Sequence, residues 1–97
     1  MKECKVIVMG FGAVGQGGAR AISLKKDMIK ERFNLELKIV AAADSSSSAI
    51  CADGLDEELL VNTKNEFGKL SNYPEYGSTI SGLDVLDAVE YDCLMEA

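Results

Sequence analysis

The stretch Gly10-Phe11-Gly12-Ala13-Val14-Gly15-Gln16-Gly17 lies between a short apolar run, residues 4–9, and a long helical pattern. The glycines therefore fall where a strand turns into a helix, which is the setting of a dinucleotide-binding turn. Gly10 allows the tight turn, Gly12 leaves room for a pyrophosphate against the backbone, and Gly15 lets the helix close onto the strand. The first turn of the helix would offer its unpaired N–H groups to the phosphates. Similar spacings also occur in plain tight turns, so the flanking strand and helix carry the prediction.

The length and composition describe a single globular domain. A chain of 97 residues buries only about 60–65% of the surface that its unfolded form exposes. The hydrophobic share of 47% and the single proline argue against disorder. No apolar run is long enough to cross a bilayer, and the start lacks the features of a signal peptide. We therefore expect a cytoplasmic protein with no membrane partner.

The cysteine and histidine content limits the chemistry of the chain. Cys4, Cys51 and Cys93 are odd in number and far apart, which favours buried reduced thiols over a disulfide framework. The chain has no histidine, which excludes histidine acid–base catalysis, Ser-His-Asp triads and histidine-ligated metal sites within it. We assign no catalytic residue and no metal ligand.

The charge is unevenly distributed along the chain. The net charge is −6, with +3 on residues 1–52 and −9 on residues 53–97. Binding to nucleic acid requires clustered lysine and arginine, so we expect no nucleic-acid partner. The acidic half is interpreted as a solvated surface.

The first half of the chain predicts a strand, a helix and a second strand. Residues 4–9 form a buried parallel strand because they are apolar and do not alternate with polar residues. A helix follows from about Ala13 to Arg32, and Asn34 is its predicted end because asparagine tolerates the left-handed conformation. The residues predicted to face the sheet have helical spacing; they are Val14, Gly18, Ile22, Ile29 and Phe33.

The second strand, residues 37–43, ends at Asp44. In a dinucleotide-binding fold a carboxylate at this end accepts hydrogen bonds from the adenosine ribose and repels a 2′-phosphate, which favours NAD over NADP. Asp44 lies 29 residues after Gly15, farther than the usual distance of about 20, and the long helix accounts for the excess. The alternative is a carboxylate that caps a turn before the serines of residues 45–48. Those serines are interpreted as a loop that could also hold a 2′-phosphate, so NADP stays open.

The second half predicts an acidic helix over residues 55–67 that ends at Gly68, with an irregular connection after it. Within that connection Tyr73 and Tyr76 are expected to pin the loop to the body of the protein. Leu55, Leu59, Leu60 and Thr63 are expected to face inward. The remaining predicted elements are a brief third strand over residues 78–80, a short helix over residues 84–89 and a final strand over residues 91–97.

This order of elements predicts an α/β fold, a partial Rossmann-like doubly wound parallel sheet with right-handed crossovers. The expected strand order is 3-2-1-4, which places the last strand beside the first. A ligand would lie at the carboxyl ends of those two strands. Residues 1–97 are assigned to one dinucleotide-binding domain.

Several segments together resemble the amino-terminal, cofactor-binding part of homoserine dehydrogenase, in particular the short archaeal type. The glycine turn is common to many dehydrogenases, but its combination with the other segments is more specific, and the resemblance spans nearly the whole chain. The segments that carry it are Gly10 to Gly15, Ala43-Asp44-Ser45-Ser46, Asp53-Gly54-Leu55-Asp56, Gly68-Lys69-Leu70-Ser71-Asn72-Tyr73-Pro74 and Leu94-Met95-Glu96-Ala97.

The resemblance implies an oxidoreductase of threonine and methionine biosynthesis that reduces aspartate 4-semialdehyde reversibly to L-homoserine with NAD or NADP. It also implies a set of cofactor contacts. Ser47 departs from the pattern, since a glycine commonly follows Asp-Ser-Ser in the family. By similarity, Phe11, Ala13 and Val14 contact the pyrophosphate and its ribose, Asp44 and Ser45 contact the adenosine ribose or its phosphate, and Lys64 contacts the adenosine side.

The family continues beyond the position of Ala97 with residues that approach the nicotinamide and with a substrate domain. We therefore expect the domain to be incomplete, with the small-molecule substrate bound only by the full-length enzyme. The chain alone would hold a cofactor but not complete a hydride transfer. A truncated sheet would also leave a strand edge open, so we expect self-association. The alternatives are a non-catalytic dinucleotide-sensing module and the cofactor domain of another semialdehyde or imine oxidoreductase.

Overall fold

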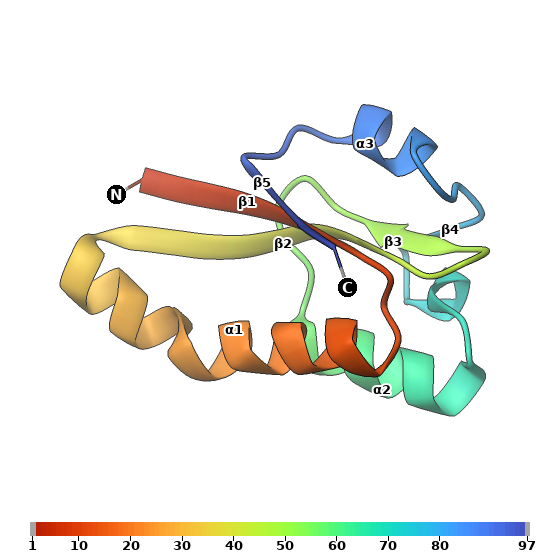
Figure 1. Ribbon diagram of the computed structural model, residues 1–97, viewed down its shortest axis with the longest axis horizontal. Helices are drawn as coiled ribbons and strands as arrows, with labels where there is room; N and C mark the ends of the chain where they lie inside the picture. Colours follow the sequence, from red (N-terminus) through yellow and green to blue (C-terminus); the bar gives the residue numbers. More distant parts are fainter. Residues whose placement is uncertain (1, 97) are drawn as a thin grey trace.

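Figure 1 shows the computed structural model of the chain, which describes residues 2–96. One twisted sheet separates two layers of helix. Helices α1 (Ala13–Phe33) and α2 (Glu57–Phe67) lie along one face of the sheet, and the short helix α3 (Asp84–Ala88) lies over the other. The α/β class and the Rossmann-like arrangement are thereby confirmed.

The sheet has the strand order β4-β3-β2-β1-β5. Strand β1 pairs in parallel with β2 on one side and with β5 on the other, so the last strand does lie beside the first. Met1 and Ala97, at the two ends of the predicted domain, lie outside the described residues. The strands are β1 (Lys2–Met9), β2 (Leu35–Ala43), β3 (Ser48–Ile50), β4 (Gly77–Ser78) and β5 (Cys93–Glu96).

The predicted order 3-2-1-4 is wrong because β3 was not expected. This strand begins at the end of the serine run and pairs antiparallel with both β2 and β4. The chain reverses immediately after β2, where the Asp44 N–H donates to the Ser47 carbonyl oxygen at 3.0 Å. Antiparallel pairing follows, since a parallel neighbour needs a long crossover that so short a connection cannot supply.

Helix α1 begins at Ala13 and ends where Asn34 adopts a left-handed conformation with φ of 52°, both as predicted. Its buried face differs from the predicted one. Val14 is 73% exposed and Phe33 is 69% exposed. Ile22 is buried as predicted. The other buried residues are Gly15 and Ala19, each one position after a predicted one, because a helix backbone can approach the sheet closely only through small side chains.

Helix α2 starts two residues later than predicted. Asp56 caps it by accepting a hydrogen bond from the Leu59 N–H at 2.9 Å. Gly68 ends it in a left-handed conformation, as predicted. Leu59 is 37% exposed, contrary to prediction, because the buried stripe of the helix runs through other positions. The predicted inward positions that are buried are Leu55, Leu60 and Thr63.

Each face of the sheet has its own apolar cluster. The cluster under α1 and α2 includes Phe11, Leu60, Leu70 and Tyr73, and the smaller cluster under α3 includes Val85. The Tyr73 hydroxyl accepts a hydrogen bond from the Asp56 N–H at 3.0 Å, so this side chain does pin the connection to the body. The larger cluster is continuous with the glycine turn through Phe11.

The three cysteines are free thiols, but they are not all buried. Cys51 is buried, Cys4 is half-buried and Cys93 is exposed. Cys93 was expected to be covered, and it is open because β5 is an edge strand with no neighbour beyond it among the described strands. None of the helices within residues 2–96 has the length and apolar character needed to cross a membrane.

Candidate functional site

The glycine turn leads from the carboxyl end of β1 into α1 and is hydrogen-bonded to the carboxyl end of β2. Gly10 has φ of 77°, a conformation that favours glycine. The Phe11 N–H donates to the Ala43 carbonyl oxygen at 2.8 Å, and the Gly12 N–H donates to the Gly10 carbonyl oxygen at 2.8 Å. The Phe11 side chain is fully buried. Phe11 therefore shapes the turn, with its ring covered by the protein and its N–H already bonded.

The start of α1 presents backbone N–H groups without helical partners. The first hydrogen bond of the helix runs from the Gln16 N–H to the Gly12 carbonyl oxygen at 2.9 Å, so the N–H groups of Ala13, Val14 and Gly15 have no acceptor within the helix. The helix has no side-chain cap. These amides and the positive end of the helix dipole are suited to an anion such as a diphosphate.

Gly12, which precedes these amides, has open space on the side where a side chain would lie. A Cβ placed on Gly12 would meet nothing within 4 Å. The conformation of this residue, with φ of −86°, does not itself require glycine. Gly12 is therefore not needed for internal packing, which is consistent with the predicted close approach of a phosphate to the backbone.

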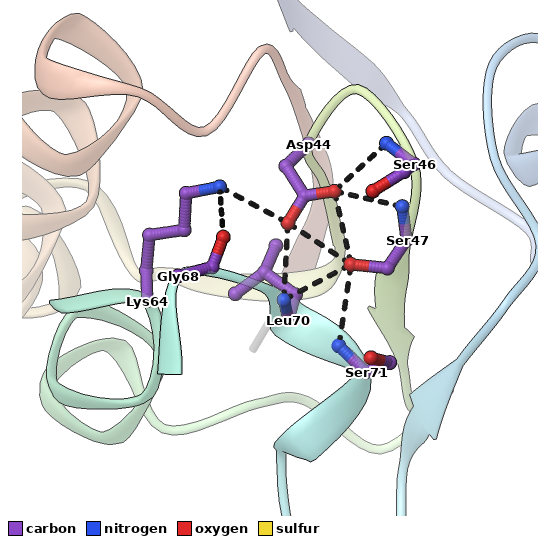
Figure 2. A network of polar contacts seen from close by, with 7 residues as sticks. All are labelled: Asp44, Ser46, Ser47, Lys64, Gly68, Leu70 and Ser71. Carbon is purple, nitrogen blue, oxygen red and sulfur yellow. Dashed lines mark hydrogen bonds and ion pairs between the residues drawn. The ribbon is translucent and has the colours of Figure 1, made fainter. Parts of the chain in front are cut away.

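Asp44 lies directly after β2, as predicted, but its carboxylate is not an open acceptor. Figure 2 shows that donors of the chain surround it. The Asp44 side chain is only 5% exposed. Its Oδ1 accepts from the N–H groups of Ser46 and Ser47 at 3.0 and 2.7 Å, and its Oδ2 accepts from Lys64 Nζ at 3.2 Å and the Leu70 N–H at 3.0 Å. The Ser47 hydroxyl is 2.9 Å from both oxygens.

These contacts determine the protonation state of Asp44. Burial by itself would raise the pKa of its carboxyl. The hydrogen bonds from Ser46, Ser47, Leu70 and Lys64 outweigh burial and lower the pKa from 3.8 to about 2. Asp44 is therefore a carboxylate at neutral pH, and its charge is balanced locally by the Lys64 ammonium.

The other residues predicted to contact the adenosine side lie at the same corner of the molecule, which we define as the place where the end of β2 meets the end of α2. Lys64 Nζ also donates to the Gly68 carbonyl oxygen at 3.0 Å (Figure 2). Ser45 and Ser46, which follow Asp44 in the chain, are exposed. The structure thus brings Asp44, Ser45 and Lys64 to one corner, and the Phe11–Ala43 hydrogen bond joins that corner to the glycine turn.

Several members of this network were not predicted as site residues; they are Ser46, Ser47, Gly68, Leu70 and Ser71. The Ser47 hydroxyl accepts from the N–H groups of Leu70 and Ser71 at 3.0 and 3.3 Å, and Leu70 also donates to Asp44. An aspartate followed three positions later by a serine is typical of a local turn, so part of this network was visible in the sequence. The long-range contact with Leu70 had no sequence signal. Within residues 2–96 there is no cluster of three or more histidine, cysteine or acidic residues that could hold a metal ion.

Comparison with known proteins assigns the chain to a family. The family model described as Glutamate/Leucine/Phenylalanine/Valine dehydrogenase matches residues 1–97. A homoserine dehydrogenase of Methanocaldococcus jannaschii is 43% identical over 91 residues, which cover 94% of this chain and 27% of that protein. A glutamate dehydrogenase of Thermotoga maritima is 34% identical over 96 residues, which cover 99% of this chain and 20% of that protein.

Among solved structures, a hyperthermophilic archaeal homoserine dehydrogenase in complex with NADPH superimposes with a TM-score of 0.81 at 25% identity, over 98% of this chain and 28% of that one. The chain thus spans between a fifth and somewhat more than a quarter of the length of these proteins. The resemblance to homoserine dehydrogenase stated from the motifs is confirmed. The chain belongs to the Glutamate/Leucine/Phenylalanine/Valine dehydrogenase family and is a homologue of the archaeal homoserine dehydrogenases.

Proposed function

We propose that this chain is the NAD(P)-binding part of a homoserine dehydrogenase, an enzyme that interconverts aspartate 4-semialdehyde and L-homoserine by hydride transfer. The observation that carries the proposal is the start of α1, where three backbone N–H groups lack helical acceptors beside a glycine with free space in front of it. The 43% identity to the Methanocaldococcus jannaschii homoserine dehydrogenase supports the choice of substrate.

Different residues of the chain would bind different parts of the cofactor. The N–H groups of Ala13, Val14 and Gly15 would donate to the cofactor diphosphate, with Gly10 and Gly12 shaping the turn that lets it approach. Ser45 and Lys64 would meet the adenosine ribose, at the corner that Asp44 organises. The nicotinamide ring of the bound cofactor supplies the hydride. The semialdehyde and the groups that transfer protons to it would be held by further residues of the full-length enzyme.

Gly12 allows binding to be tested without disturbing the fold. A methyl group at Gly12 meets no protein atom within 4 Å but occupies the space assigned to the diphosphate. We expect Gly12→Ala to leave the melting temperature of the chain unchanged. We expect it to lower the affinity for NADH and for NADPH by about tenfold or more, as measured by calorimetric titration. Gly17→Ala is the matched control, because a methyl group there also meets nothing within 4 Å and Gly17 lies beyond the first turn of α1.

Failure of the unsubstituted, folded chain to bind either cofactor would overturn the proposal. Equal binding by the unsubstituted chain and Gly12→Ala would instead show that the cofactor lies elsewhere.

A second candidate is the cofactor domain of an amino-acid dehydrogenase that acts through an imine. The family description and the 34% identity to the Thermotoga maritima glutamate dehydrogenase favour it. Both candidates use the same glycine turn, so cofactor binding does not separate them. An assay of the full-length protein separates them: NAD(P)⁺ reduction is measured in parallel with L-homoserine and with L-glutamate as the substrate. Oxidation of glutamate alone would replace the homoserine dehydrogenase proposal with this one.

A further inference from the structure

The carboxylate of Asp44 has little capacity left for an external ligand. Two carboxylate oxygens offer about four lone-pair positions. Five donor groups already point at them: the N–H groups of Ser46, Ser47 and Leu70, the Ser47 hydroxyl and the Lys64 ammonium. A ribose diol could bond to Asp44 only by displacing one of these donors.

The donors come from segments far apart in the chain. Ser46 and Ser47 belong to the turn after β2, Lys64 to the last turn of α2, and Leu70 to the short 3₁₀ helix over residues 70–72. The Ser47 hydroxyl strengthens the same connection by accepting from Leu70 and Ser71. Asp44 and Ser47 together thus tie the serine turn to the end of α2 (Figure 2).

From these contacts we infer that Asp44 is a positioning residue of the cofactor site and not its ribose ligand. Asp44 holds the serine turn and the Lys64 ammonium in place, and other groups of that corner contact the adenosine ribose. The inference rests on the proposed cofactor function and adds a consequence for selectivity. A carboxylate whose charge is balanced by Lys64 and by three backbone N–H groups does not repel a 2′-phosphate as a free one would. Asp44 therefore gives no reason to expect NAD rather than NADP as the cofactor.

Two substitutions separate positioning from direct binding. Asp44→Asn removes the charge, and Ser47→Ala removes the hydroxyl that shares the donors while leaving the charge in place. If Asp44 acts by positioning, both variants bind NADH and NADPH more weakly than the unsubstituted chain, each by about threefold or more. The ratio of the two affinities then stays within about twofold of the value for the unsubstituted chain. Affinities are measured by calorimetric titration at a temperature where circular dichroism shows each variant folded. If Asp44 and Ser47 had a purely structural role, the substitutions would lower the melting temperature without changing these affinities.

Direct binding predicts a different pattern. If Asp44 gripped the ribose, Asp44→Asn would shift the NADH to NADPH affinity ratio toward NADPH by about tenfold or more, while Ser47→Ala would leave the ratio unchanged. That result, or unchanged affinities in folded Asp44→Asn, would overturn the inference. If Asp44→Asn does not fold, Ser47→Ala decides: equal weakening of both cofactors supports the inference, and unchanged affinities overturn it.

The controls are Asp27→Asn and Ser23→Ala. Both residues are exposed on α1, and neither takes part in the hydrogen bonds around Asp44. We expect these variants to bind both cofactors as the unsubstituted chain does. If that chain bound neither NADH nor NADPH, the proposed function itself would fail. A shifted ratio in a chain that binds both overturns only the role assigned to Asp44.

Discussion

Gly15 lies so close to Gly10 that a Cβ on Gly15 would be 2.5 Å from the Gly10 carbonyl oxygen. That oxygen also accepts a hydrogen bond from the Gly12 N–H at 2.8 Å, which leaves it little freedom to move. We expect Gly15→Ala to lower the free energy of unfolding by about 2 kcal/mol or more. The usual gain of about 1 kcal/mol from alanine inside a helix would not compensate for the clash. Urea unfolding followed by circular dichroism measures the change.

Gly17→Ala is the control for this substitution. The same propensity gain of about 1 kcal/mol applies at Gly17, where a Cβ meets nothing within 4 Å. The control should therefore be as stable as the unsubstituted chain or more so. A Gly15→Ala chain that is equally stable would show that the turn is not tightly constrained.

The pH dependence of stability should report the Asp44 network. The pKa of Asp44 is about 2 in the folded chain, below the ordinary value of 3.8 for this carboxyl group. Because the folded-state pKa is the lower one, the stabilisation is complete above about pH 4 and is lost as the pH falls toward 2. The contribution is about 2 kcal/mol. Unfolding free energies measured between pH 5 and pH 2, about the range of this loss, should show it.

The Asp44→Asn variant isolates this contribution. It has no carboxyl to titrate at this position, so its stability should fall less steeply over the same pH range. Parallel pH profiles for the variant and the unsubstituted chain would mean that other carboxyl groups account for the acid sensitivity.

The Tyr73 hydroxyl should contribute measurably to stability. It accepts a hydrogen bond from the Asp56 N–H at 3.0 Å, and its ring is buried in the larger cluster. Tyr73→Phe keeps the ring but leaves that N–H without its acceptor, which should cost about 1 kcal/mol. Thermal unfolding measures the effect. Tyr91→Phe, at an exposed tyrosine, should change the melting temperature little, and an equal change in both variants would count against the Asp56 contact.

The open edge of β5 should promote self-association. Strand β5 is the last strand of the sheet on its side, and Leu94 on it is 39% exposed. An unpaired strand edge with apolar side chains is prone to pair with another copy. We expect concentration-dependent oligomers in sedimentation velocity, reduced by Leu94→Lys. Leu24→Lys, at an exposed position of α1, is the control, and a chain that stays monomeric at high concentration would contradict this prediction.

The glycine turn and its surroundings could be predicted because their signals are local. The strand before the glycines, the helix after them and the left-handed caps at Asn34 and Gly68 each depend on a few neighbouring residues. The position of Asp44 at the end of β2 was predicted for the same reason. The hydrogen-bond partners of its carboxylate were not predicted, since Leu70 is 26 residues away and meets Asp44 only after the chain has folded.

The sheet order and the buried face of α1 required tertiary information. The serine run was interpreted as a loop, yet Ser48 begins a strand and its hydroxyl donates to the Ile80 carbonyl oxygen at 2.7 Å. Nothing adjacent in sequence indicates that partner. On α1, Val14 and Phe33 fit a helical apolar stripe, but close packing against the sheet selected the glycine and alanine positions instead.

The burial of Phe11 has a consequence for how fast a ligand could bind. Its ring is fixed in the larger cluster, and its N–H is bonded to Ala43, so the turn is held in shape by the interior of the protein. A preorganised loop loses little conformational entropy when it captures a ligand. Association at this turn would then be governed by diffusion and orientation rather than by a slow rearrangement of the backbone.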